Sequence, residues 1–124
     1  MKPFIFAAPL LTALVVTASP AGAHHAFNMY DGTFVNFTGT VTSWEWKNPH
    51  AMIEVTAKMP DGTNQVWTVE CSAPNIIGRR GWDKDSVKVG DTLPMVIHPM
   101  KDGSKYGLVV KMTKKDGKVL NDKA

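Results

Sequence analysis

The chain has 124 residues, a formal net charge of +3 at pH 7 and a single cysteine, Cys71. This length fits one domain, and a lone cysteine excludes an internal disulfide. The lysines are spread along the chain, and so small an excess of positive charge gives no reason to expect nucleic-acid binding.

Residues 1–23 predict a secretory signal peptide. An almost unbroken apolar run over 4–16 precedes Ala21-Gly22-Ala23, which fits the small-residue cleavage pattern. The run is shorter than the roughly 20 residues that a membrane-spanning helix needs, so we expect no stable membrane insertion after cleavage. Cleavage after Ala23 would leave a single periplasmic or secreted domain, 24–124, that begins with His24.

The first half of this domain predicts three strands. Apolar and polar residues alternate over 35–46 and 50–59, and Gly39 marks a bulge or tight curve in the first strand. The Asp-Gly pair within 60–63 predicts a hairpin turn, which leads to a third strand over 64–71.

The alternation stops in 72–82, where Ser72 could cap a short helix that Gly78 or Gly81 ends. Fourth and fifth strands are expected further on, over 92–98 and 107–113, before a polar C-terminal tail with room for one short hairpin at Asp116-Gly117. Three strands, a short helix and two strands are the order of an OB-fold. We therefore predict an all-β, five-stranded OB-like barrel, with an open sandwich as the alternative.

The four histidines are the candidate metal ligands. A free amino terminus at His24 would offer both its α-amine and its ring Nδ1, and His50, at the start of the second strand, could supply a third nitrogen. Such a three-nitrogen site suits Cu(II), with zinc as the second choice. His25 and His98, which ends the fourth strand, are optional further ligands.

A second interpretation is a ligand- or protein-interaction module. Stacked tryptophans offer a binding platform on such barrels, and paired arginines can clamp a carboxylate or phosphate. Alternatively, the tryptophans belong to the core, and the arginines pair with Asp83 and Asp85. We favour both of these structural roles. The residues concerned are Trp44, Trp46, Arg79, Arg80 and Trp82.

Two further residues carry predictions. Cys71 lacks a histidine at blue-copper spacing, so we expect a small buried hydrophobic residue. Glu70, if buried, needs a partner, for which Arg79, Lys47 or a histidine could serve. No nucleophile, phosphate-binding or zinc-protease motif is present. A copper oxidase similar to the N-terminal-histidine oxygenases is a third interpretation, for which the sequence shows no clear substrate platform.

Several segments resemble a family of small exported bacterial proteins of unknown function. They are "HHAF" (24–27), "EWKNPHAMIEV" (45–55), "SAPNIIGRRGW" (72–82), "VKVGD" (87–91) and "HPMKDGS" (98–104). The resemblance covers nearly all of the chain after the signal and implies a small, β-rich, periplasmic or secreted domain. It implies no activity. We therefore predict a non-enzymatic periplasmic metal-binding protein, most plausibly for copper, that serves a periplasmic protein partner.

Overall fold

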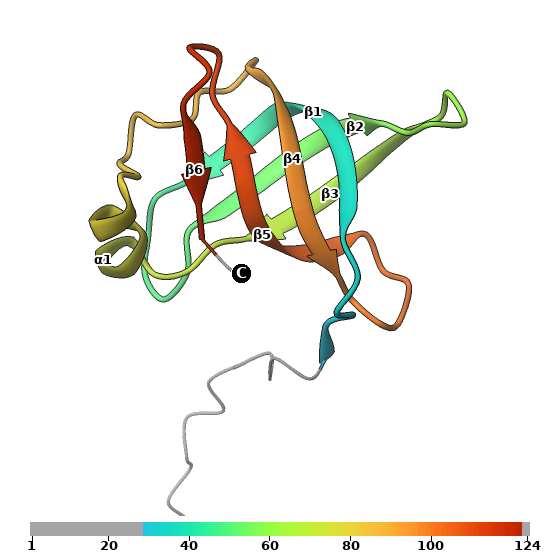
Figure 1. The fold of residues 1–124 in the computed structure, drawn as a ribbon, viewed down its shortest axis with the longest axis horizontal. Helices are drawn as coiled ribbons and strands as arrows, with labels where there is room; N and C mark the ends of the chain where they lie inside the picture. Colours follow the sequence, from blue (N-terminus) through green and yellow to red (C-terminus); the bar gives the residue numbers. More distant parts are fainter. Residues whose placement is uncertain (1–28, 123–124) are drawn as a thin grey trace, which may run out of the picture.

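The computed structural model describes residues 29–122 (Figure 1). The predicted signal peptide, His24 and His25 lie outside this range. The elements are β1 (Val35–Glu45), β2 (Met52–Lys58), β3 (Asn64–Glu70), α1 (Pro74–Ile77), a 3-10 turn (Gly78–Arg80), β4 (Thr92–Pro99), β5 (Tyr106–Thr113) and β6 (Val119–Asn121).

The strands close into a barrel. β1 pairs antiparallel with β2 on one side and β4 on the other, while β3 pairs with β2 and β5 with β4. A short parallel pairing of Thr68–Glu70 with Tyr106–Leu108 joins β3 to β5 and completes the ring. The predicted five-stranded OB-like barrel, with one short helix between its third and fourth strands, is confirmed.

The predicted alternation in the second strand is also confirmed. Ala51, Ile53, Val55 and Ala57 are all fully buried in the barrel interior, as a half-buried strand with a period of two requires. Ile77 of α1 joins the same core, so the helix covers the interior as well as linking β3 to β4.

A bulge in β1 decides where the tryptophans lie. The pairing with β2 shifts between Val41 and Ser43, which brings Trp44 opposite the buried Ile53. A strict alternation from Val41 would have placed Trp44 on the outer face, so one extra residue turns it toward the core. The bulge is not at Gly39, where the sequence predicted a bulge or a tight curve. At Gly39 a Cβ would lie 2.9 Å from the Cβ of Val55, so a close approach of the strands requires glycine there.

The N-cap of the helix lies one residue later than predicted. Ala73, not Ser72, is the N-cap, and no side chain caps the helix, because the Ser72 hydroxyl donates to Asp122 instead. Gly78 caps α1, and Gly81, with a φ of 93°, ends the 3-10 turn, so both predicted glycines act as stops.

The predicted polar tail contains β6, which follows the hairpin that Asp116-Gly117 indicated. β6 pairs with β5, and Leu120 is buried in the core. Asp122 is also buried. Within residues 29–122, no helix is long and apolar enough to cross a membrane.

Candidate metal site around Glu70 and His50

Glu70 is a buried carboxylate on the outer side of the barrel. It is the last residue of β3, paired with Met52 on β2 and Leu108 on β5. Val66 shares its face of β3 and is 57% exposed, whereas Glu70 is only 5% exposed. The difference arises because two tyrosines cover this end of the sheet.

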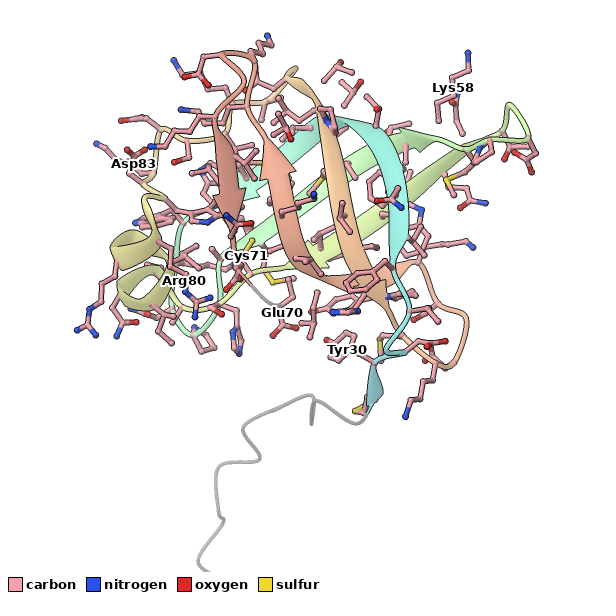
Figure 2. All side chains as sticks on the ribbon, viewed as in Figure 1. Tyr30, Lys58, Glu70, Cys71, Arg80 and Asp83 are labelled. Atoms are coloured by element: carbon pink, nitrogen blue, oxygen red, sulfur yellow. The ribbon has the colours of Figure 1, made fainter. Side chains whose placement is uncertain are left out.

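The two oxygens of Glu70 have different partners. Oε2 accepts a hydrogen bond from the Tyr106 hydroxyl at 2.7 Å and a longer one from the Tyr30 hydroxyl at 3.3 Å. Oε1 faces His50, whose Nδ1 lies 3.4 Å away. Figure 2 shows Tyr30 and Glu70 close together where the N-terminal segment meets the barrel. The phenols thus hold the carboxylate with its second oxygen directed at the imidazole.

Both tyrosines are held in their protonated form. Burial, together with the charge of Glu70 and the hydrogen bond to it, raises the pKa of Tyr30 above its ordinary value. The pKa of Tyr106 is raised by burial and by the same carboxylate. Each hydroxyl therefore remains a donor to Glu70 over the whole physiological pH range.

His50 presents two different ring edges. Its Nδ1 is buried and has no hydrogen-bond partner among the described residues, although Glu70 lies within ion-pair distance. The side chain as a whole is 29% exposed. The buried nitrogen therefore faces the carboxylate, while exposed ring surface remains for another group. The prediction that a buried Glu70 would pair with Arg79, Lys47 or a histidine is fulfilled by His50.

The chain preceding β1 is fastened to the same region. The Asp31 amide donates to the Pro99 carbonyl at 2.8 Å, and the Lys101 amide donates to the Met29 carbonyl at 3.0 Å. Tyr30 forms a bridge with Met100 and is 5% exposed. The N-terminal segment therefore enters the fold beside Glu70.

His98 has a different environment. Its Nδ1 lies 2.8 Å from the Thr33 carbonyl oxygen, its residue is 6% exposed, and the Phe34 ring lies over it with centroids 4.7 Å apart. These contacts give His98 a structural role, fastening residues 33–34 to β4. Across the described range, no three histidine, cysteine or acidic side chains form a group that could hold a metal.

The tryptophans of the second interpretation pack together. The ring centroids of Trp44 and Trp46 are 5.8 Å apart, and those of Trp44 and Trp82 are 6.3 Å apart. The indole N–H of Trp44 donates to the Lys84 carbonyl, and that of Trp82 to the Asn121 carbonyl. These contacts account for the three rings within the fold, and ligand binding by them stays a prediction.

The two arginines, Arg79 and Arg80, have different environments. Arg80 pairs with the buried Asp122 at 2.8 Å and also donates to its carbonyl, so the favoured pairing with Asp83 and Asp85 is wrong. Asp83 instead accepts hydrogen bonds from its own turn. Arg79 is exposed. Asp122 directly follows β6, and its pairing with Arg80 across 42 residues could not be predicted from local sequence.

Cys71 is fully buried, as predicted. The site residues that sequence reasoning did not name are Tyr30 and Tyr106. Their one sequence signal is rarity, since they are the only tyrosines of the chain. Nothing in their spacing indicates that both reach one carboxylate.

The comparison with protein families gives one result. The model of DUF6152, a family of unknown function, matches residues 12–111. The chain belongs to DUF6152. Neither a curated protein nor a solved structure matches the chain. Membership in DUF6152 supports the expectation of an uncharacterised family and names no ligand, so function has to be argued from the site.

Proposed function

We propose that this member of DUF6152 is an exported, non-enzymatic metal-binding protein that holds copper(II), with zinc as the second choice. The ion would be bound by the amino terminus that cleavage after Ala23 exposes, through the α-amine and ring of His24, and by the ring of His50. The observation that carries the proposal is that one carboxylate, Glu70, contacts both Tyr30 of the N-terminal segment and His50.

Chain length permits the two halves of the site to meet. Met29 lies five positions after His24, and five residues reach at most about 18 Å when extended. Met29 is fastened to Lys101, and the neighbouring Tyr30 reaches Glu70. Because Glu70 also contacts His50, the N-terminal segment enters the fold near the imidazole that completes the site.

The donor chemistry fits copper(II). An amine and an imidazole nitrogen of one residue form a compact chelate, and a second imidazole adds a third nitrogen in the tetragonal arrangement that Cu(II) favours. His50 supports this role because its Nδ1 faces a carboxylate, an arrangement common for metal-binding histidines, whose other nitrogen then faces the metal. His25 stays an optional ligand. His98 is the weaker option, because its Nδ1 already contacts the Thr33 carbonyl oxygen and the Phe34 ring packs against its imidazole.

Binding to the mature protein tests the proposal. Cu(II) and Zn(II) are titrated into a protein that begins at His24, then into one with a single glycine added before His24, and into His50→Ala. The matched control carries the same glycine after Ala124. We expect the N-terminal addition and His50→Ala each to lower Cu(II) affinity by at least about tenfold, which is about 1.4 kcal/mol, and the C-terminal addition to change nothing.

Two results would overturn the proposal. One is Cu(II) affinity that the N-terminal glycine leaves unchanged. The other is mass spectrometry of the exported protein that shows a first residue other than His24. A role in delivery or buffering further requires a periplasmic protein partner, which a pull-down with the copper-loaded protein would identify.

A further inference from the structure

We propose that the outer face of the barrel binds an acidic polysaccharide, a chain of sugars that carries a carboxylate on successive residues. The site is a groove that crosses β1 and its neighbouring strands. This inference goes beyond the proposed metal site, because it uses none of the proposed ligands and does not depend on that site.

The groove consists of two hollows that meet on β1. One, of about 440 Å³, lies over β1, β4 and β5, and Asn36, Thr38 and Lys111 are among its lining residues. The other, of about 550 Å³, lies over β1, β2, β3 and β4 and is lined by Thr38, Thr40, Thr56, Lys58, Asn64 and Thr92. Each volume is in the range of small-molecule sites, about 300–1,000 Å³. Because Thr38 lines both hollows, they adjoin and form one surface across the strands.

The charge of the groove is positive. Lys58 extends from the end of β2 away from the barrel (Figure 2), Lys111 is exposed on β5, and neither forms an ion pair within residues 29–122. No aspartate or glutamate of that range lines either hollow. Glu45 and Glu54, on β1 and β2, line a separate hollow. An anionic ligand is therefore attracted to the groove and kept away from the part of the face beside these carboxylates.

The separation of the two lysines indicates a chain rather than a small anion. The strands β5, β4, β1 and β2 are neighbours in that order, so three spacings of about 4.8 Å, roughly 14 Å in total, separate the strands that carry Lys111 and Lys58. A single carboxylate or phosphate group is too small to span this distance. A polymer with a charge on successive sugar residues can contact both lysines at once.

Between the lysines the groove offers neutral hydrogen-bonding groups. The hydroxyls of Thr38 and Thr56 form no hydrogen bond with another side chain or backbone group of the described range. Thr40 and Thr92 share one hydrogen bond at 2.9 Å, which leaves each oxygen able to accept another. Threonine hydroxyls both donate and accept, as the hydroxyls of a sugar do. The groove therefore suits the hydroxyl groups of a polysaccharide as well as its charges.

The same surface is poorly suited to single-stranded nucleic acid. Proteins that bind such strands without sequence preference stack the bases on aromatic side chains. Among the described residues that line the two hollows, the one aromatic residue is Phe37, which is only 6% exposed. The groove thus has the charge to attract a nucleic acid but no ring on which a base could stack.

Binding of defined polymers tests the inference. The protein that begins at His24 is titrated, without metal, with short polygalacturonate fragments, and heat release measures the affinity. Galacturonate monomer, uncharged dextran and oligo-dT are the comparison ligands. The variants are Lys58→Gln, Lys111→Gln, their double variant and Thr38→Val. Lys84→Gln is the matched control, since Lys84 is also exposed but lines neither hollow. Circular dichroism checks that each variant is folded.

We expect polygalacturonate to bind, and the monomer and dextran to bind much more weakly. Each groove lysine should contribute about two- to fivefold to the affinity, as an exposed ion pair does. The double variant should lose roughly the product, because the two sites are more than about 10 Å apart. Thr38→Val should weaken binding by about two- to tenfold through the lost hydrogen bond. Lys84→Gln should leave the affinity unchanged.

Four results would each overturn the inference. They are no binding of polygalacturonate, equal affinity for the monomer and the chain, equal losses from Lys84→Gln and the groove lysines, and tighter binding of oligo-dT than of polygalacturonate. The third would show attraction by net charge alone, and the fourth would assign the groove to nucleic acid. None of these results bears on Cu(II) binding, so this inference and the proposed function fail independently.

Discussion

Two buried carboxylates near the end of β3 are paired in opposite ways. Asp122 accepts hydrogen bonds from the Ser72 amide at 2.6 Å and hydroxyl at 2.7 Å, and it pairs with Arg80 at 2.8 Å. Glu70 accepts from two neutral phenols and faces a histidine nitrogen that makes no hydrogen bond in the described range. Figure 2 shows Arg80 beside the helix and Glu70 beside the N-terminal segment.

The difference separates a structural cluster from a candidate functional one. Asp122 has a formal cation and two short hydrogen bonds, so its charge is compensated inside the fold and it fastens β6 to the segment after β3. Glu70 pairs with no lysine or arginine of the described range, and the histidine beside it retains exposed ring surface. Incomplete pairing of a buried group marks a place where a ligand can supply what the fold does not.

The largest effect on stability is expected for Asp122→Ala. We expect it to lower the free energy of unfolding by about 3 kcal/mol, because it leaves the Ser72 donors unsatisfied and breaks an ion pair whose carboxylate is buried and whose guanidinium is partly exposed. Denaturant unfolding followed by tryptophan fluorescence measures this loss. The control is Asp85→Ala, which removes an exposed carboxylate. A loss of less than about 1 kcal/mol would contradict the structural role of the cluster.

Glu70→Gln should lower the free energy of unfolding by less, about 1–2 kcal/mol. The amide oxygen can still accept the short hydrogen bond from Tyr106, and no lysine or arginine is left unpaired. The same denaturant measurement applies. If Glu70→Gln proved more destabilising than Asp122→Ala, Glu70 would be the structural carboxylate and the comparison would be reversed.

Alkaline pH tests the tyrosines that hold Glu70. Because the folded pKa values of Tyr30 and Tyr106 are raised, the native state keeps protons that the unfolded chain loses above about pH 10. Their contribution to stability is therefore complete below that pH and is lost as the pH rises toward the folded values. We expect unfolding to become easier between neutral pH and pH values above about 10.

Phenolate absorbance measures the same effect directly, since these are the only tyrosines of the chain. In the native protein the absorbance should rise at higher pH than in the denatured protein. Tyr106→Phe should leave the single, still raised transition of Tyr30. Identical native and denatured titrations would mean that the phenols are not bound to Glu70.

The smallest effect is expected for Arg79→Ala. Its free energy of unfolding should lie within about 0.5 kcal/mol of wild type, because the Arg79 side chain is exposed. Arg80→Ala, the neighbouring control, should lower the free energy of unfolding by about 1 kcal/mol, because the guanidinium of its ion pair with Asp122 is partly exposed to solvent. Equal effects of the two substitutions would contradict the division of the Arg-Arg pair into one structural and one exposed residue.

The local patterns predicted the fold well. Alternation located the buried face of β2, Asp-Gly located the β2–β3 turn, and the order of elements indicated the OB-like barrel. The face of β1 on which Trp44 lies could not be predicted from alternation, because one bulged residue moves every later side chain of the strand to the opposite face. The candidate site was predicted only in part. His50 was named, and Glu70 was expected to need a partner, but neither tyrosine was included.

The sequence by itself determined the strands, the turns and the buried stripes, since these depend on residues close together along the chain. Tertiary structure alone decided which distant side chains share a carboxylate. Glu70 meets Tyr30 and Tyr106 from 40 and 36 residues away, and Arg80 meets Asp122 from 42 residues away. The Tyr106 contact follows from barrel closure, in which β3 pairs with β5. The Tyr30 and Asp122 contacts follow from the bridge of Tyr30 to Met100 and from the pairing of β6 with β5. Local spacing predicts none of these pairings.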